Sequence, residues 1–114
     1  MDALLKTNLN DNEKKALNLL KENLQKRYKI SEIILYGSKA RGDSEKESDM
    51  DVLVILENEV NDNLREEIFN LSFEIELEYD VIFGILIEQK DFWGSLRAKS
   101  MPIHWNIDRE GITV

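Results

Sequence analysis

The stretch from Gly37 to Asp51, GSKARGDSEKESDMD, limits the folds open to this chain more than any other feature. It places glycines, serines, basic residues and aspartates, two of them one residue apart, between a β-branched run that ends at Tyr36 and an apolar run that begins at Val52. Short apolar runs bounded by turn residues are typical of buried strands. The sequence therefore predicts two strands joined by a polar segment that carries the chemistry.

The chain before this stretch predicts a helix. Leucines recur three and four residues apart between Asn10 and Lys29, so they line one helical face. Asn10 followed by Glu13 matches a capping box, in which each side chain accepts a hydrogen bond from the backbone of the other residue. A buried strand over residues 33–36 is predicted to follow this helix.

The segment from Asn61 to Tyr79 fits both a helical stripe and the alternation of a strand. We expect a helix to about Glu78, because one strand over residues 73–87 would be more than twice the usual length of about 5–6 residues. The third strand is then expected to begin at Asp80.

Short helices are predicted near the C-terminus, one within residues 88–100 and one opened by Pro102 and closed by Gly111. Helices and strands alternate along the chain without repeats or linkers, which predicts an α/β (α+β) fold. With 114 residues, the chain is expected to form a single domain, 1–114.

Composition disfavours several classes of function. A net charge of −8 removes the attraction to phosphates on which binding to long nucleic acids depends. The absence of cysteine excludes thiolate metal sites, and the apolar runs are far shorter than the roughly 20 residues of a membrane span. Without a secretory signal pattern, the expected location is cytoplasmic. The acidity instead suits a basic protein partner or divalent cations.

The two aspartates of the opening stretch suit a divalent cation. Asp49 and Asp51 are two residues apart at the start of a predicted strand, so their side chains point to the same face. Two neighbouring carboxylates repel each other unless a cation joins them, and oxygen ligands suit Mg²⁺ or Mn²⁺. These ions usually bind substrate phosphates as well, and Gly37 and Ser38, at the start of a predicted helix, offer N–H groups and a hydroxyl to such an anion.

The spaced pattern GSKARG, DSEKE and SDMD resembles the nucleotidyltransferase superfamily with the DNA polymerase β-like fold. More narrowly, it resembles the minimal nucleotidyltransferases (MNT) that are the antitoxins of HEPN/MNT toxin–antitoxin systems. The ending NIDREGITV is similar to the Ile-x-x-Glu-Gly ending common in that family. The resemblance implies a small mixed sheet flanked by helices.

Residue by residue, the resemblance implies that Asp49 and Asp51 are catalytic and hold the metal ions. It also implies a third catalytic and metal-binding carboxylate from the next strand, which we assign to Asp80, with Glu78 as the alternative.

The resemblance further implies that Gly37 and Ser38 contact the terminal phosphates of the nucleotide. Arg41 is a candidate for the same role, and an ion pair of Arg41 with Asp43 or Glu47 is the alternative.

Other polar and aromatic side chains are expected to be structural. Lys39 is expected at the surface, and His104 either at the surface or hydrogen-bonded. The apolar side chains near the C-terminus are expected either to pack on the sheet or to form an interface: Phe92, Trp93, Ile103 and Trp105.

The expected reaction is a two-metal displacement at the α-phosphate of a nucleoside triphosphate. The resemblance implies ATP as donor, AMP as the transferred group, and a tyrosine hydroxyl of a partner HEPN toxin, a ribonuclease, as acceptor. Asp80 is expected nearest this acceptor, where it can help to accept the proton.

Two alternatives to this enzymatic antitoxin remain open. One is an antitoxin that only binds and occludes its toxin. The other is a nucleotidyltransferase that acts on a small hydroxylated molecule, for which a homo-oligomer would complete the acceptor pocket.

Overall fold

The computed structural model describes residues 7, 9–43 and 48–114. In this part of the chain four strands form one mixed sheet with the order β3-β2-β1-β4. β1 pairs antiparallel with β2 and β4, whereas β2 and β3 are parallel. The strands are β1 (Ile30–Tyr36), β2 (Met50–Leu56), β3 (Phe83–Gln89) and β4 (Ile112–Thr113).

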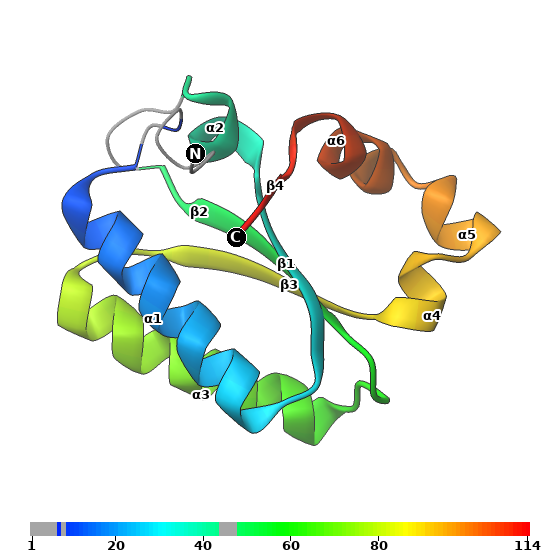
Figure 1. Cartoon of the computed structure of the whole chain (residues 1–114), viewed down its shortest axis with the longest axis horizontal. Helices are drawn as coiled ribbons and strands as arrows, with labels where there is room; N and C mark the ends of the chain where they lie inside the picture. Colours follow the sequence, from blue (N-terminus) through cyan, green and yellow to red (C-terminus); the bar gives the residue numbers. More distant parts are fainter. Residues whose placement is uncertain (1–6, 8, 44–47) are drawn as a thin grey trace.

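Helices cover both faces of this sheet. Figure 1 shows α1 and α3 side by side on one face, and α4, α5 and α6 grouped on the other side. The predicted mixed sheet flanked by helices is confirmed. The helices are α1 (Asp11–Arg27), α2 (Gly37–Arg41), α3 (Asp62–Tyr79), α4 (Lys90–Trp93), α5 (Leu96–Lys99) and α6 (Pro102–Glu110).

The central strand β2 is buried on both faces, as its continuous apolar sequence predicts. Its even-numbered side chains belong to the core beneath α1 and α3. Leu53 and Ile55 point to the other face, where they pack with Trp93 and Ile107. Because side chains alternate along a strand, Asp51 points to the same face as Leu53, toward α6.

Several predicted elements are confirmed. The capping box of α1 is present, with Glu13 N donating to Asn10 Oδ1 (2.8 Å) and Asn10 N donating to Glu13 Oε1 (3.0 Å). α3 has the predicted helical form, and α6 opens with Pro102 and closes before Gly111. Residues 88–100 contain two short helices instead of one, and the two-residue strand β4 was not predicted.

The prediction that the third strand begins at Asp80 is wrong. α3 continues to Tyr79, and Asp80 ends it in the left-handed conformation (φ 55°), with its N–H bonded to the carbonyl oxygen of Glu76. The side chain of Glu76 then accepts a hydrogen bond from Phe83 N (2.8 Å), where β3 starts. Asp80 is therefore a helix cap, and asparagine and aspartate are the non-glycine residues that tolerate this conformation best.

The C-terminal aromatic residues divide between core and surface. Trp93 is buried and stacks on His104 at 4.3 Å between ring centroids. Nε2 of His104 donates to the carbonyl oxygen of Trp93 (2.9 Å), so the hydrogen-bonded alternative for this histidine is confirmed. Trp105 is exposed. None of the helices in the described part of the chain has the length and apolarity to cross a membrane.

The prediction that Lys39 is a surface charge is wrong. Only 2% of its side chain is exposed, and its Nζ lies 2.9 Å from Oε2 of Glu13, which is also almost completely buried. The four-carbon stem of lysine reaches from α2 to the first turn of α1. This buried ion pair fixes the short helix α2 against the longer one.

Replacing Lys39 by methionine is expected to lower the free energy of unfolding by about 3–5 kcal/mol, because Glu13 would remain buried without a partner. Urea unfolding measures this change. The double variant Lys39→Met/Glu13→Gln removes both charges and is expected to recover a large part of the loss. Equal stability of the single and double variants would contradict the role given to the pair.

Candidate active site

The carboxylate of Asp51 lies in a slot between two glycines. In the sheet, Asp51 is level with Tyr36 of β1 and Gly84 of β3. A Cβ atom on Gly37 would lie 2.5 Å from Oδ2 of Asp51, and one on Gly84 would lie 2.8 Å from Oδ1. Both distances are too short for a real side chain, so the carboxylate occupies its position only because both neighbours lack one.

Asp49 lies close enough to affect the charge of Asp51. The pKa of Asp51 is raised, first by partial burial and then by the negative charge of Asp49. The guanidinium of Arg41 acts in the opposite direction but does not cancel the rise in pKa. Burial and Asp51 also raise the pKa of Tyr36. The pair of aspartates thus concentrates negative charge where a cation would relieve it.

Glu110 at the end of α6 binds the groups that were predicted to contact phosphate. Gly37 N donates to its Oε1 (3.2 Å) and Arg41 Nη1 donates to its Oε2 (2.9 Å). Arg41 also pairs with Asp43 (3.1 Å), so that part of the predicted alternative is confirmed, and Glu47 lies outside the described residues. The Glu110 carboxylate therefore accepts hydrogen bonds from donors that are suited to an anionic ligand.

Gly37 and Ser38 lie at the start of α2, as predicted. Gly37 has φ +77°, a conformation that favours glycine. The carbonyl oxygen of Ser38 accepts bonds from the N–H groups of Gly42 (2.9 Å) and Asp43 (3.1 Å), which close the short helix. Ser38 is half-buried and lies one helical turn before Arg41 on α2.

The predicted trio of metal ligands is not assembled in the structure. Among the described residues, no three side chains of histidine, cysteine, aspartate or glutamate come close enough together to hold a metal ion. Asp80 caps α3, in the layer on the face opposite to the one that Asp51 points toward, and the alternative Glu78 is exposed on α3 itself. The β3 residue level with Asp51 is Gly84, which has no carboxylate.

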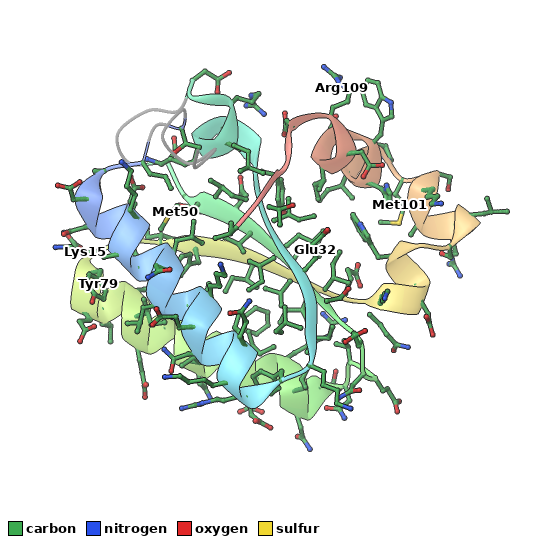
Figure 2. All side chains as sticks on the ribbon, in the orientation of Figure 1. Lys15, Glu32, Met50, Tyr79, Met101 and Arg109 are labelled. Atoms are coloured by element: carbon green, nitrogen blue, oxygen red, sulfur yellow. The ribbon has the colours of Figure 1, made fainter. Side chains whose placement is uncertain are left out.

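A cavity of about 480 Å³ lies at the same end of the sheet. Its walls come from the start of α1, the end of α3 and the residue that precedes Asp49, and Figure 2 shows Lys15 and Tyr79 at this end of the two helices and Met50 at the start of β2. Asp80 thus lines this cavity, whose wall includes Ser48 but neither Asp49 nor Asp51. The lining residues are Asn10, Asn12, Glu13, Ser48, Asp80, Val81 and Ile82.

Two residues of the site were missed from the sequence. Gly84 interrupts an apolar strand, which is a known sign of close approach by another group. Glu110 was noted only as part of a C-terminal pattern. Its contact with Gly37 joins residues 73 positions apart, and local sequence patterns contain no information on such a pairing.

The model of the family described as "Nucleotidyltransferase domain" matches residues 17–102. The chain belongs to this nucleotidyltransferase family. A Methanocaldococcus jannaschii relative named "Putative protein adenylyltransferase MJ0604" is 31% identical over 102 residues, which are 88% of this chain and 95% of the relative. MJ0141 of the same organism, with the same descriptive name, is 34% identical over 62 residues, 54% of this chain and 63% of the relative.

Solved structures share the fold of this nucleotidyltransferase. A toxin–antitoxin structure with AMP-PNP has a TM-score of 0.59 at 19% identity, covering 87% of this chain and 69% of that chain. A structure of a tri-AMPylated Shewanella oneidensis HEPN toxin in complex with an MNT antitoxin contains a chain that matches with a TM-score of 0.52 at 20% identity. The match covers 90% of this chain and 67% of that chain. The predicted membership of the nucleotidyltransferases and the predicted fold are confirmed, and the chain is a nucleotidyltransferase.

Gly84→Ala is expected to weaken binding of Mg²⁺ and AMP-PNP to this nucleotidyltransferase by at least about tenfold, because the new Cβ displaces the Asp51 carboxylate. Isothermal titration calorimetry measures the affinity. Gly94→Ala is the matched control, since a Cβ there would lie at an ordinary 3.5 Å from the Lys90 carbonyl oxygen. Equal affinities in the two variants would contradict the glycine slot.

Asp51→Asn is expected to raise the melting temperature near pH 7 when a chelator is present. Because the folded pKa of Asp51 lies above its ordinary value of 3.8, the protonated carboxyl stabilises the fold below that value, and this stability is lost as pH rises through the folded pKa. Asparagine retains the neutral form at all pH. The advantage should disappear as pH falls below about 4, and an Asn variant less stable near pH 7 would contradict this account.

Proposed function

We propose that this nucleotidyltransferase transfers AMP from ATP to a hydroxyl group of a protein, with a tyrosine of a HEPN-family toxin as the acceptor and pyrophosphate as the leaving group. The observation that carries the proposal is the Asp51 carboxylate held between Gly37 and Gly84, with Asp49 beside it. Transfer would neutralise the toxin. The relatives named as protein adenylyltransferases and the AMPylated toxin in a structure of the same fold support this choice of reaction and acceptor.

The aspartate pair fits Mg²⁺ or Mn²⁺, because such ions often bind through one or two carboxylates and the phosphates of the substrate. Asp49 and Asp51 would hold the metal, with the Asp51 carboxylate kept in position between Gly37 and Gly84. When bound, a divalent cation supplies Lewis-acid stabilisation of the phosphates and lowers the pKa of an acceptor hydroxyl. Whether one or two ions bind depends on the phosphates, since no third carboxylate is assembled among the described residues.

The groups around Gly37 would bind the nucleotide. The N–H of Gly37 and the guanidinium of Arg41 now donate to Glu110, and a triphosphate presents the same kind of anionic acceptor. The phosphates would therefore displace Glu110, while Ser38 adds its hydroxyl. Asp80 lines a cavity on the α1 and α3 side of the sheet, so it would take up the proton of the attacking hydroxyl only if the acceptor entered through that cavity.

An antitoxin that only binds its toxin is the second candidate. It is favoured by one observation: Asp80 does not join Asp49 and Asp51 in a group of metal ligands. In that case the nucleotide site would be retained without turnover.

Intact-mass spectrometry of the co-encoded neighbouring protein, incubated with this chain, ATP and Mg²⁺, tests the proposal. We expect the neighbour to gain one or more AMP groups with the wild-type chain and none with Asp49→Asn/Asp51→Asn. An unmodified neighbour in a stable complex would support binding without transfer. An unmodified neighbour that forms no complex would contradict both candidates for that pair.

A further inference from the structure

The outer face of α3 carries apolar side chains that no other described residue covers. Phe69, Phe73 and Leu77 are four residues apart and are 45%, 57% and 69% exposed. Ile82, 58% exposed, continues this row beyond the end of the helix. We refer to these four side chains as the α3 stripe. Contiguous exposed apolar groups of this kind mark interaction sites. The side of α3 that packs in the core is formed by Ile68, Leu71, Ser72 and Ile75.

Acidic side chains lie beside the α3 stripe on the same helix. The charged residues of α3 are all acidic except Arg65, which donates to the carbonyl oxygen of Ile87 (3.1 Å). Glu74 and Glu78 are four residues apart near the C-terminal end of the helix, where no basic residue occurs in the last turn. Like charges at this spacing repel, and carboxylates at a helix C-terminus oppose its dipole. The charges of Glu74 and Glu78 therefore reduce the stability of α3, so a stabilising role in the fold does not explain their presence.

The α3 stripe leads toward the candidate active site. Phe73, Leu77 and Ile82 line a shallow groove of about 300 Å³ that also includes Asp80. Asp80 and Ile82 are shared with the larger cavity of about 480 Å³, whose wall also contains Ser48, the residue before Asp49. A molecule bound along the stripe would therefore reach this larger cavity.

The other exposed apolar side chains have basic surroundings. Leu96 and Trp105 are 87% and 59% exposed, and the guanidinium of Arg109 lies 4.4 Å from the centroid of the Trp105 ring. Arg97 and Lys99 lie on α5 beside Leu96, and Figure 2 shows Arg109 on the outer side of α6. A second copy could place this basic patch on the acidic stripe only in a head-to-tail contact, which builds rings or open chains instead of a simple pair.

Charge complementarity selects a basic protein as the partner. The carboxylates around the α3 stripe repel nucleic acids and attract lysine and arginine. An amphipathic helix that lays apolar side chains on Phe73 and Leu77 and basic side chains beside Glu74 and Glu78 matches both features of the surface.

We propose that the α3 stripe docks the protein that accepts the nucleotide, through an amphipathic helix of that protein with lysines or arginines beside its apolar face. The inference rests on the proposed transfer to a protein hydroxyl. Docking at the stripe positions the acceptor hydroxyl in the cavity beside Asp80. The stripe thus selects the substrate, whereas Asp49 and Asp51 act on the nucleotide.

Fluorescence anisotropy with two labelled helical peptides of about 18 residues, or about five turns, tests the docking surface. One peptide carries leucines flanked by lysines, and the other carries the same leucines flanked by glutamates. The proteins compared are wild type, Phe73→Lys/Leu77→Lys on the stripe, and the matched control Phe92→Lys/Leu96→Lys on α4 and α5. All four substituted side chains are exposed, and both variants add the same charge.

The lysine peptide is expected to bind wild type and the control variant alike, and the stripe variant at least about tenfold more weakly, which corresponds to about 1.4 kcal/mol. Equal losses in both variants, no binding to wild type, or stronger binding of the glutamate peptide would overturn the proposal. A wild-type oligomer in light scattering that the stripe substitutions dissociate would also overturn it, in favour of a second copy.

Binding of Mg²⁺ and AMP-PNP to the same proteins separates this inference from the proposed function. The stripe variant is expected to keep the nucleotide affinity of wild type, because Phe73 and Leu77 do not contact the aspartate slot. If wild type binds the lysine peptide through the stripe but does not bind the nucleotide, the proposed transfer fails while the docking surface stands. If wild type binds the nucleotide but not the lysine peptide, the docking surface fails while the proposed transfer stands.

Discussion

The position of the Asp51 carboxylate is the constraint on which the rest of the site depends. It is a partly buried charge near the start of β2, beside the charge of Asp49, and both features raise its pKa. The structure gives it space by omitting side chains at Gly37 and Gly84. Burying a charge without a partner is costly. The carboxylates of Asp51 and Asp49 therefore lie close together at a cost to stability. Binding of a cation explains this arrangement, whereas stability of the fold does not.

The short helix α2 is held from both sides of the sheet. Lys39 joins it to the start of α1 through the buried pair with Glu13, and Glu110 of α6 joins it to the opposite layer through Gly37 and Arg41. These contacts set the position of the Gly37 N–H group relative to the Asp51 carboxylate. The contact with Glu110 involves a partly exposed carboxylate, so it can exchange for a phosphate, whereas the pair with Glu13 cannot leave without a large cost.

Local patterns were sufficient for most of the fold, and they pointed to the stretch that brings Gly37 against the Asp51 carboxylate. The capping box at Asn10, the helical period of α3 and the strands around the opening stretch all depend on near neighbours, and all are observed. The placement of Asp80 failed because a left-handed helix cap and the register of β3 on β2 decide it. The prediction that Lys39 lies at the surface failed because its partner, Glu13, comes from a helix distant in the sequence. Glu110 and the α3 stripe likewise required the packing of the whole chain.

The measurement that tests the account most directly is backbone amide NMR of the ¹⁵N-labelled protein during titration with AMP-PNP, with and without Mg²⁺. The account predicts that the Gly37 amide changes first, as phosphate replaces Glu110, and that Gly84 follows only when Mg²⁺ is present, as the Asp51 carboxylate takes up the cation. A Gly37 signal that stays unchanged at saturating nucleotide, or equal changes with and without Mg²⁺, would contradict the assignment of this slot as the nucleotidyl-transfer site.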